Sequence, residues 1–360
     1  MSKKIVLTGG GTAGHVTPNI ALLPSLKAAG YEIWYIGSYN GIEERLIKEQ
    51  NIPYYGIDSG KLRRYFDWKN FSDPLRVIHG YAQAKKILSR LKPDVVFSKG
   101  GFVSVPVVRA ASALHIRTII HESDMTPGLA NRLAIPAADK VCCSFPETLK
   151  YLPEGKAVLS GSPIRQELLT GERGKALELL HWENSSKPTL LVIGGSQGSV
   201  AINNALRSDL DELLKEFRII HLCGKGNLDS SLDGREGYVQ FEYIQDELKD
   251  LFALADLVLS RAGANSICEL LALRKPNILI PLPAIASRGD QLQNAASFEK
   301  QGFSCVLQED DITDELLLQT IHKVYENRQS YIDTMTKSPQ DQAITLIADL
   351  LDRLAQKRRK

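Results

Sequence analysis

Short apolar runs alternate along the chain with longer segments in which apolar residues recur at helical spacing. In the first half, the apolar runs cover residues 4–8, 32–36, 94–97, 118–121 and 140–144, and helical spacing covers residues 14–29, 41–49 and 103–115. Strands that alternate with amphipathic helices are typical of a parallel sheet with crossover helices. The pattern therefore predicts an α/β fold for this half.

The alternation loosens over residues 151–187, which are rich in Pro, Gly, Ser and charge, as a domain junction would be. It then restarts with a predicted strand (189–193), a glycine loop (194–199) and a predicted helix (200–214), and further strands are expected at 218–222, 238–241, 256–260, 277–280 and 304–307. We predict two Rossmann-like domains with parallel sheets that face each other across a cleft. The first covers residues 1–162 and is joined by a final helix within 341–360, and the second covers residues 163–340.

Composition and charge remove several classes of protein. Lys and Arg number 44 against 42 Asp and Glu, and a formal net charge of +2 lacks the basic field of a dedicated nucleic-acid-binding protein. The five cysteines are scattered without a C-x-x-C pair, so buried, reduced thiols are expected. The best candidate for a membrane span, residues 103–114, is interrupted by Pro106 and Arg109 and is shorter than the roughly 20 residues required. We expect a cytoplasmic protein that at most touches a membrane.

Gly9, Gly11 and Gly14 form a G-x-G-x-x-G pattern between a predicted strand and a predicted helix. Backbone N–H groups and the helix dipole at such a loop favour an anion such as a diphosphate. A dinucleotide-binding protein would carry Asp or Glu at the end of its second strand, where this chain has Ser38. A nicotinamide cofactor therefore loses support, and we expect no cofactor.

His15 follows this loop in the first predicted helical turn, where the helix dipole opposes a positive imidazole. The neutral ring could act as a general base beside a phosphate site. The alternative is that His15 only hydrogen-bonds the backbone near the start of the helix.

Four segments, taken in order, carry a resemblance to a known family: residues 9–15 (GGGTAGH), 98–106 (SKGGFVSVP), 121–124 (HESD) and 194–198 (GGSQG). Together they resemble the bacterial UDP-N-acetylglucosamine transferases that complete the lipid-linked peptidoglycan precursor. The resemblance covers both halves of the chain and implies the GT-B type of glycosyltransferase architecture. Family members commonly carry Gly-Gly where this chain has Ala13-Gly14, and Asn where it has Asp124, which leaves a donor contact at Asp124 open.

Contacts to the sugar donor are expected mainly in the second half. Ser196 could place its hydroxyl and neighbouring N–H groups on a UDP phosphate, and Arg165 offers a forked cation, although an ion pair between domains would also explain this arginine. Glu269 follows another strand, glycine turn and helix start. Its carboxylate could bind both ribose hydroxyls, or it could cap the helix together with Ser266 in an S-x-x-E box. The resemblance favours the ribose.

Gln291 and Asn294 lie one turn apart on a predicted helix and suit sugar hydroxyls, although an ordinary polar helix face would look the same. The resemblance implies that Gln291 contacts the sugar and that Ile244 contacts uracil through its backbone. The full set of residues expected at UDP-N-acetylglucosamine is Thr12, Ala13, Gly14, Arg165, Ser196, Ile244, Ala264, Asn265, Ser266, Glu269, Gln291 and Asn294.

The acceptor diphosphate is expected in the first half, at Gly10, Gly11, Gly14, Ser98, Gly100 and Gly101. Asp209-Leu210-Asp211 has the form of a D-x-D metal site, but it lies near the end of a helical segment and far in sequence from the glycine loops. We expect solvated carboxylates there and no metal, with helix N-termini and Arg165 stabilising the UDP leaving group instead.

The segment 61–92 is locally basic, with nine Lys and Arg side chains against Asp67 and Asp73, and it carries interleaved aromatic residues. Such a mixture suits an anionic membrane surface, while RNA or a solvated helix with partly buried rings would look similar. A lipid-linked acceptor favours peripheral attachment to the cytoplasmic face of the membrane, which the basic tail at 357–360 would assist. We expect no nucleic-acid partner.

The resemblance implies inverting transfer of N-acetylglucosamine from its UDP donor to the C4 hydroxyl of undecaprenyl-diphospho-N-acetylmuramoyl-pentapeptide. His15 is the first choice for the base, with Glu122 as the alternative. Two other functions remain open: a UDP-N-acetylglucosamine epimerase of the same fold, which needs no acceptor, and a nucleotide-sugar sensor, which turns nothing over.

Overall fold

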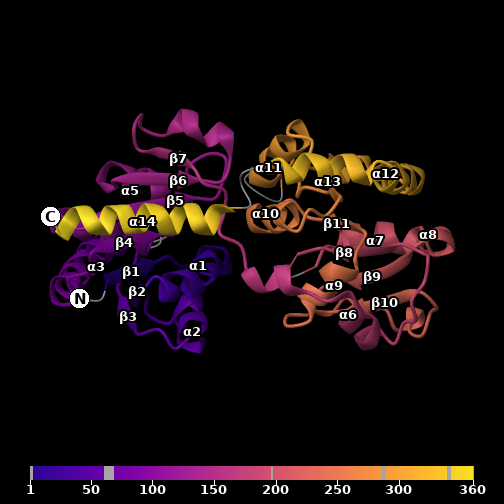
Figure 1. Cartoon of the computed structure of the whole chain (residues 1–360), viewed down its shortest axis with the longest axis horizontal. Coiled ribbons are helices and arrows are strands. Elements are labelled where there is room, and N and C mark those ends of the chain that lie inside the picture. Colours follow the sequence, from indigo (N-terminus) through magenta and orange to yellow (C-terminus); the bar gives the residue numbers. More distant parts are fainter. Residues whose placement is uncertain (1–2, 61–68, 196–197, 286–288, 339–341, 360) are drawn as a thin grey trace. The chain divides into compact units, whose positions relative to one another are not determined.

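The computed structural model describes residues 3–60, 69–195, 198–285, 289–338 and 342–359, without the side chains of 69–75 and 357–359. The chain divides into two compact units (Figure 1). Unit 1 comprises Met1–Arg165 together with Gln342–Lys360, and unit 2 comprises Gln166–Asp341. The division falls just after Arg165, where the sequence predicted a boundary after residue 162.

Unit 1 is a seven-stranded parallel sheet in the order β3-β2-β1-β4-β5-β6-β7. Its strands are β1 (Lys3–Thr8), β2 (Tyr31–Ser38), β3 (Tyr54–Ile57), β4 (Val95–Ser98), β5 (Arg117–Glu122), β6 (Lys140–Cys143) and β7 (Ala157–Leu159). Its helices are α1 (Thr17–Ala28), α2 (Ile42–Glu49), α3 (Lys69–Leu91), α4 (Ser104–Ala113), α5 (Leu129–Ala134) and α14 (Ala343–Arg359), with 3-10 turns at Ala13–His15, Ile135–Ala137 and Pro146–Tyr151. The parallel sheet predicted for the first half is confirmed.

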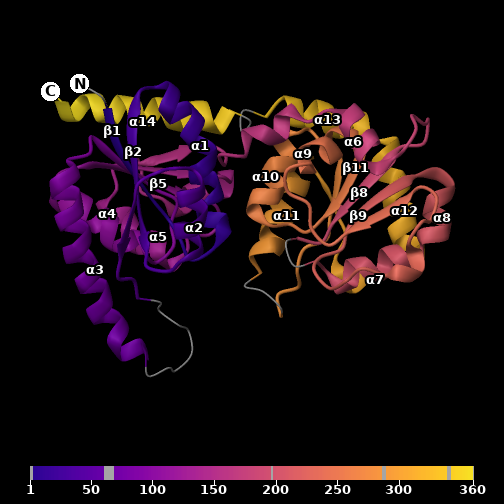
Figure 2. The same ribbon diagram turned by 90° about the horizontal axis from the view of Figure 1, so that it is seen from below.

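The C-terminal helix α14 completes the core of unit 1. Ile347 and Leu351 are fully buried in the cluster that also contains the apolar residues of β1 and α1. An ion pair between Lys3 and Asp352 (2.9 Å) ties the helix to the first strand, and both ends of the chain lie on this unit (Figures 1 and 2). Burial of one apolar face of α14 explains why the last helix returns to the first unit.

Unit 2 is a six-stranded parallel sheet in the order β10-β9-β8-β11-β12-β13. Its strands are β8 (Thr189–Ile193), β9 (Arg218–Leu222), β10 (Tyr238–Phe241), β11 (Leu257–Ser260), β12 (Asn277–Leu279) and β13 (Cys305–Val306). Its helices are α6 (Arg173–Leu180), α7 (Val200–Ser208), α8 (Leu210–Glu216), α9 (Leu248–Leu254), α10 (Ala264–Ala272), α11 (Asp290–Lys300), α12 (Asp314–Glu326) and α13 (Arg328–Thr336), with 3-10 turns at Gln166–Thr170, Ser230–Leu232 and Glu309–Asp311.

Two details differ from the helices expected from the sequence. The segment 200–214 is not one helix, because the backbone leaves helical geometry at Asp209 and α8 begins at Leu210. The break lets Leu206, Leu210 and Leu213 all bury their side chains in the same core. In unit 1, a 3-10 turn at Ala13–His15 precedes α1, so His15 lies before the α-helix rather than in its first turn.

Within the part of the chain that the structure describes, no helix combines the length and the apolar character needed to cross a membrane.

Candidate functional site

The glycine loops sit where each sheet reverses its strand order. In unit 1 the reversal lies between β1 and β4, and in unit 2 it lies between β8 and β11. Ligands of open parallel sheets bind at such positions, beyond the carboxyl ends of the strands. The candidate sites are therefore the loops that follow β1 and β4 in one unit and β8 and β11 in the other.

In unit 1 the structure brings together the two loops that were expected to share the acceptor. The N–H of Lys99 donates to the carbonyl of Thr8 (2.9 Å), which continues the pairing of β1 and β4 into the loops. Gly101 has a φ of +84° and lies so close to Gly10 that a side chain at Gly101 would collide with the Gly10 carbonyl. Only glycine satisfies both demands at this position.

His15 is half-buried at the edge of the first loop, beside the exposed Thr12. Its Nδ1 lies 3.1 Å from the Thr12 hydroxyl. The pKa of His15 is lowered to about 4, chiefly because burial disfavours the charged ring and also because Lys99 is positively charged. The ring is therefore neutral at physiological pH, as the sequence predicted, but burial rather than the helix dipole is the main cause.

Lys99 is a buried cation in this unit that the sequence reasoning did not single out. Its Nζ donates to Nδ1 of His121 (2.7 Å) and also contacts the hydroxyl of Ser123. The other ring nitrogen of His121 lies 2.8 Å from the carbonyl of Gly161, so His121 carries its proton on Nε2. Burial and the Lys99 charge hold the pKa of His121 well below its usual range. A lysine directly after a buried strand was the available signal.

Glu122 is buried, and its carboxylate is already fully engaged. It accepts hydrogen bonds from the N–H groups of Asp124 (2.9 Å) and Gly128 (3.0 Å) and from the side-chain amide of Asn131 (2.9 Å). These bonds fix the loop after β5. In this structure Glu122 therefore holds the backbone of the loop after β5.

Ser98 is fully buried, and its hydroxyl accepts the N–H of Gly100 (3.2 Å). This bond holds the start of the loop after β4. Gly101 is half-buried, and the first loop exposes Gly11, Thr12 and Ala13.

The first loop also holds a carboxylate that the sequence reasoning missed. Glu43, in the first turn of α2, is completely buried. One of its oxygens accepts the N–H of Gly11 (3.2 Å), and the other accepts the N–H of Ser38 (3.1 Å) and its hydroxyl. The sequence reasoning looked for an acidic residue at the end of the second strand, at Ser38. Glu43 follows shortly after that strand, at the start of α2.

In unit 2 the second glycine loop leads into α7, whose N-cap is Ser199. The Ser199 hydroxyl accepts the N–H of Ile202 (3.3 Å) and a hydrogen bond from Nη2 of Arg261 (2.6 Å). The bond to Ser199 links the loops after β8 and β11, and Arg261 also forms an ion pair with Glu309, in the 3-10 turn after β13. Arg261 was not among the predicted site residues. Ser196 lies outside the described residues.

Glu269 does not form the capping box that competed with its ribose role. The helix α10 begins at Ala264 with Gly263 as its N-cap, so Ser266 is inside the helix and Glu269 lies more than a turn from its start. No side chain caps this helix end. The N–H groups of the first turn, at Ala264, Asn265 and Ser266, are those that a helix N-terminus leaves for an anion.

The two amides of α11 have different surroundings. The carbonyl oxygen of Gln291 accepts the N–H of Leu282 (3.0 Å), and the residue is half-buried. Asn294 is almost completely buried, and its amide donates to the carbonyl of Ala262 (3.2 Å). Asn294 therefore holds the loop after β11.

Two further predicted residues are half-buried. Ile244 is half-buried beyond the end of β10. Arg165 is half-buried and is the last residue of unit 1 before the chain enters unit 2.

The D-x-D sequence is not a pair of solvated carboxylates. Asp209 is buried, and its pKa is raised to about 6 because of burial and the nearby charges of Asp314 and Glu212. Asp211 is exposed and pairs with Arg235. Among the residues that the structure describes, no group of three or more His, Cys, Asp or Glu side chains is placed to hold a metal ion.

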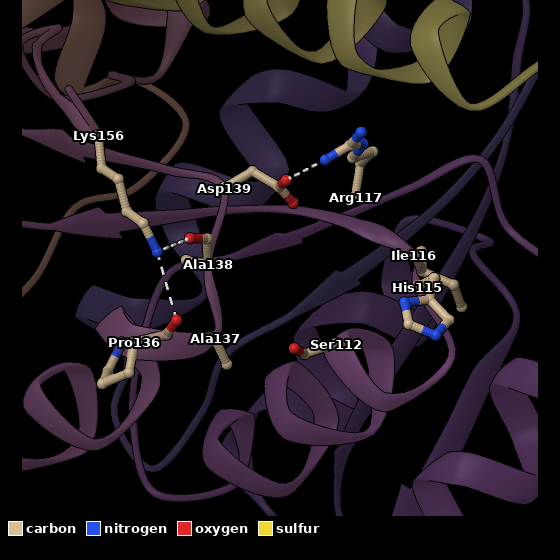
Figure 3. A pocket seen from close by; sticks show the side chains of 9 residues that line it. All are labelled: Ser112, His115, Ile116, Arg117, Pro136, Ala137, Ala138, Asp139 and Lys156. Carbon is tan, nitrogen blue, oxygen red and sulfur yellow. Dashed lines mark hydrogen bonds and ion pairs between the residues drawn. The ribbon is translucent and has the colours of Figure 1, made fainter. Parts of the chain in front are cut away.

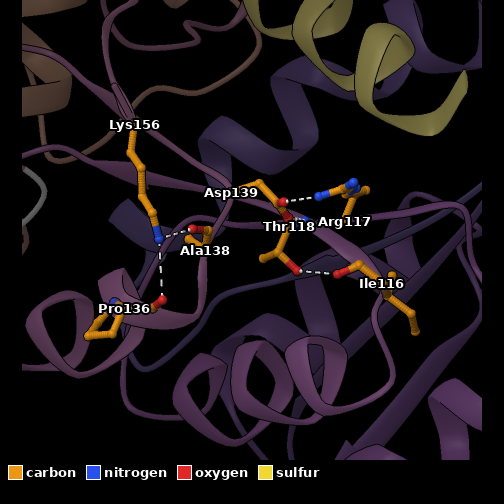
Figure 4. A network of polar contacts seen from close by, with 7 residues as sticks. All are labelled: Ile116, Arg117, Thr118, Pro136, Ala138, Asp139 and Lys156. Atoms are coloured by element: carbon orange, nitrogen blue, oxygen red, sulfur yellow. Dashed lines mark hydrogen bonds and ion pairs between the residues drawn. The ribbon is translucent and has the colours of Figure 1, made fainter. Parts of the chain in front are cut away.

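A pocket of about 390 Å³ lies at the opposite end of the first sheet, where β5 and β6 begin (Figure 3). It is lined by Ser112, His115, Ile116, Arg117, Pro136, Ala137, Ala138, Asp139 and Lys156. Its polar groups bond to one another: Arg117 pairs with Asp139 (2.6 Å), and Lys156 donates to the carbonyls of Ala138 (2.7 Å) and Pro136 (3.3 Å) (Figure 4). None of the predicted site residues lines this pocket.

Two family models match the chain. The glycosyltransferase family 28 N-terminal domain matches residues 5–143, and the glycosyltransferase family 28 C-terminal domain matches residues 189–351. The chain is 64% identical, over 97% of its length and 98% of the relative, to the UDP-N-acetylglucosamine--N-acetylmuramyl-(pentapeptide) pyrophosphoryl-undecaprenol N-acetylglucosamine transferase of Lachnospira eligens.

Solved structures are similar along the whole chain. Acinetobacter baumannii MurG has a TM-score of 0.77 and 27% identity, and the match covers 98% of this chain and 99% of that one. A UDP-GlcNAc 2-epimerase from Methanocaldococcus jannaschii has a TM-score of 0.61 over 89% of this chain and 92% of that one, but at 14% identity it shares only the fold.

Proposed function

The chain belongs to glycosyltransferase family 28 and, within it, to the family of the pyrophosphoryl-undecaprenol N-acetylglucosamine transferases, and on this basis we propose its reaction. It transfers N-acetylglucosamine from UDP-N-acetylglucosamine to the C4 hydroxyl of undecaprenyl-diphospho-N-acetylmuramoyl-pentapeptide, a step of peptidoglycan synthesis. The observation that carries this proposal is the 64% identity to the Lachnospira eligens transferase along 97% of the chain.

The chemistry proposed is a direct displacement with inversion at the anomeric carbon. His15 accepts the proton of the acceptor C4 hydroxyl, whose oxygen forms the new bond to the sugar as the bond to UDP breaks. A pKa near 4 supports this role, because the imidazole is then neutral at pH 7 and one of its ring nitrogens can accept a proton. The bond to Thr12 holds the ring in one orientation.

The donor is assigned to unit 2. The N-termini of α7 and α10 offer N–H groups to the UDP phosphates, Glu269 binds the ribose hydroxyls, Gln291 faces the sugar and Ile244 contacts uracil through its backbone. The start of α10 at Ala264 supports this assignment, because the helix does not require Glu269 as a cap.

Stabilisation of the leaving group is assigned to these helix N-termini and to Arg165, without a metal ion. Transfer should therefore continue at full rate in excess EDTA. A strict requirement for added Mg²⁺ or Mn²⁺ would contradict this part of the proposal.

The acceptor is assigned to unit 1 and to the cytoplasmic surface of the membrane. Gly14 and the loop at Gly100 and Gly101 contact its diphosphate. The described part of α3 presents the exposed side chains of Ile78, Lys85, Lys86 and Arg90, a mixture that suits an anionic headgroup layer. Residues 61–68 of this segment, like the end of the basic tail, lie outside the described residues.

One assay tests the reaction against its rivals. Labelled UDP-N-acetylglucosamine is supplied with and without the lipid-linked muramoyl-pentapeptide, and the products are separated. We expect label in the lipid fraction only when the acceptor is present. Conversion of the UDP-sugar without acceptor would indicate an epimerase, and binding without turnover would indicate a sensor.

A further inference from the structure

The N–H groups of a glycine loop at a sheet's switch point form an anion site, and in unit 1 part of that site is occupied by the protein itself. The Glu43 carboxylate is completely buried and bridges the N–H of Gly11 to the N–H of Ser38, at 3.2 and 3.1 Å. A carboxylate that accepts several N–H and O–H groups makes charge-assisted hydrogen bonds, which are stronger than neutral ones.

The backbone around Glu43 is shaped to receive this side chain. A Cβ added to Gly10 or to Gly41 would collide with the Glu43 carboxylate, and one added to Gly37 would come within 2.9 Å of its Cγ. Three glycines from three separate segments thus leave room for one carboxylate. Their φ angles are not in the left-handed region, so it is space rather than backbone conformation that requires glycine at these positions.

The other side of the first loop is held by neutral hydrogen bonds. The Tyr35 hydroxyl donates to the carbonyl of Gly9 (2.8 Å), and the Asn19 amide donates to the carbonyls of Thr8 (3.2 Å) and His15 (3.4 Å). The loop is therefore fixed at both ends, and Glu43 is the charged member of the set. Gly11, which Glu43 contacts, immediately precedes Thr12, and the Thr12 hydroxyl lies beside the His15 ring.

We propose that Glu43 is a positioning residue that takes the place of a bound anion in the first glycine loop. It holds the Gly9–Gly11 backbone in the form that aims Thr12 and His15 at the acceptor. It also keeps phosphate away from the N–H of Gly11, so the acceptor diphosphate binds at Gly14 and at the loop of Gly100 and Gly101. The catalytic part rests on the proposed function, whereas the occupancy of the loop does not.

The first test is kinetic and uses the full-length protein with both substrates. Glu43→Gln keeps the size of the side chain but places an NH₂ group against N–H donors. We expect kcat to fall about 10- to 100-fold, because small displacements of a catalytic group have effects of that order. The KM for UDP-N-acetylglucosamine should change less than about twofold. Glu43→Asp should recover part of kcat, and wild-type kcat in Glu43→Gln would overturn the proposal.

The second test replaces the missing carboxylate with formate. Glu43→Ala leaves a space of carboxylate size, so sodium formate should restore part of its kcat in a saturable way, whereas sodium chloride should not. Formate should also raise the thermal midpoint of Glu43→Ala but not that of the wild type, because a ligand that binds only the folded state stabilises it. This second readout needs no turnover, so it separates failure of the inference from failure of the proposed function.

Glu44→Ala is the matched control, because Glu44 is the next residue of α2, is only half-buried and pairs with Lys48 (2.7 Å). It should keep wild-type kcat and show no response to formate. If Glu43→Ala does not fold, the Gln and Asp variants still decide the kinetic test. A loss of kcat in Glu43→Ala with neither rescue nor thermal stabilisation by formate would show that the carboxylate site is not an anion site, and would overturn the inference.

Discussion

The two glycine loops share the order of strand, loop and helix, yet side chains of opposite charge contact them. In unit 1 the Gly11 N–H is bonded to the buried carboxylate of Glu43, while in unit 2 the corresponding helix cap, Ser199, is bonded to the guanidinium of Arg261. Among the described residues, no carboxylate is bonded to the N–H of Gly194 or Gly195. The glycine motif alone therefore does not determine the ligand, because the charge of the side chains that contact the loop decides whether the loop can bind a further anion.

The difference assigns the chemistry. A loop that already holds a negative charge suits positioning of a neutral hydroxyl and its base, whereas a loop with a cation behind it suits the diphosphate of a nucleotide. The predictions that follow separate the two loops by asking which substrate each variant affects.

The largest effect is expected at His15. His15→Gln should lower kcat by about 10²- to 10⁴-fold, the usual contribution of a general base, while UDP binding measured by calorimetry stays within about twofold. The imidazole must be unprotonated to act, and its native pKa of about 4 lies below the ordinary 6.5. The acid limb of kcat/KM in the wild type should therefore fall near pH 4 and not near pH 6.5.

The charges that face His15 provide the control for this profile. Lys99 lowers its pKa, while Glu43 and a hydrogen bond to the Gly10 backbone raise it. Lys99→Met should therefore move the acid limb toward higher pH. A wild-type limb near pH 6.5, or a fully active His15→Gln variant, would remove His15 from the reaction.

The next largest effect is expected at Glu269, in α10 of unit 2. Glu269→Ala should weaken UDP binding about tenfold, because a hydrogen bond to a charged group contributes about 1.5–3 kcal/mol. The same variant should lose the wild-type preference for UDP over 2′-deoxy-UDP. Unchanged thermal stability would fit the position of Glu269 inside α10, whereas a lower stability with intact preference would restore a purely structural role.

Inhibition of transfer by inorganic pyrophosphate allows a direct comparison of anion binding at the two loops. It should compete with UDP-N-acetylglucosamine for the N–H groups of unit 2 and act at least about tenfold more weakly against the lipid-linked acceptor, since Glu43 repels it from Gly11. Sodium sulfate at equal ionic strength controls for screening. Inhibition that is competitive with the acceptor and equally strong would mean that the first loop is an open phosphate site.

Sequence patterns located both loops because strand and helix periods are local properties. The strands β1 and β8, which precede the two loops, coincide with predicted apolar runs, and the observed and predicted strand ends agree within a few residues. The parallel sheets also followed from this alternation, whereas the order of the strands within each sheet comes from the structure. The motifs then led to the correct family.

Contacts between residues that are far apart in the sequence could not be predicted from local patterns. Glu43 reaches Gly11 from α2, 32 residues away along the chain, and Arg261 reaches Ser199 from a loop 62 residues away. Asn294 looked like a surface amide because helical spacing says nothing about which face meets another loop, and the structure buries it against Ala262. Local pattern identifies where a site lies, and tertiary packing decides which of its side chains can touch a ligand.

The smallest effect is expected at Asp209, at the break between α7 and α8. Its folded pKa of about 6 lies above the ordinary 3.8, so the folded protein binds a proton that the unfolded chain releases, and ionised Asp209 destabilises the fold above pH 6. Asp209→Asn should therefore raise the free energy of unfolding at pH 7.5 by about 1 kcal/mol and gain nothing near pH 4. Asp211→Asn, at the exposed partner of the same D-x-D sequence, should change stability by less than about 0.5 kcal/mol at either pH. If added Mg²⁺ stabilised the wild type and either substitution abolished that effect, the pair would be a metal site after all.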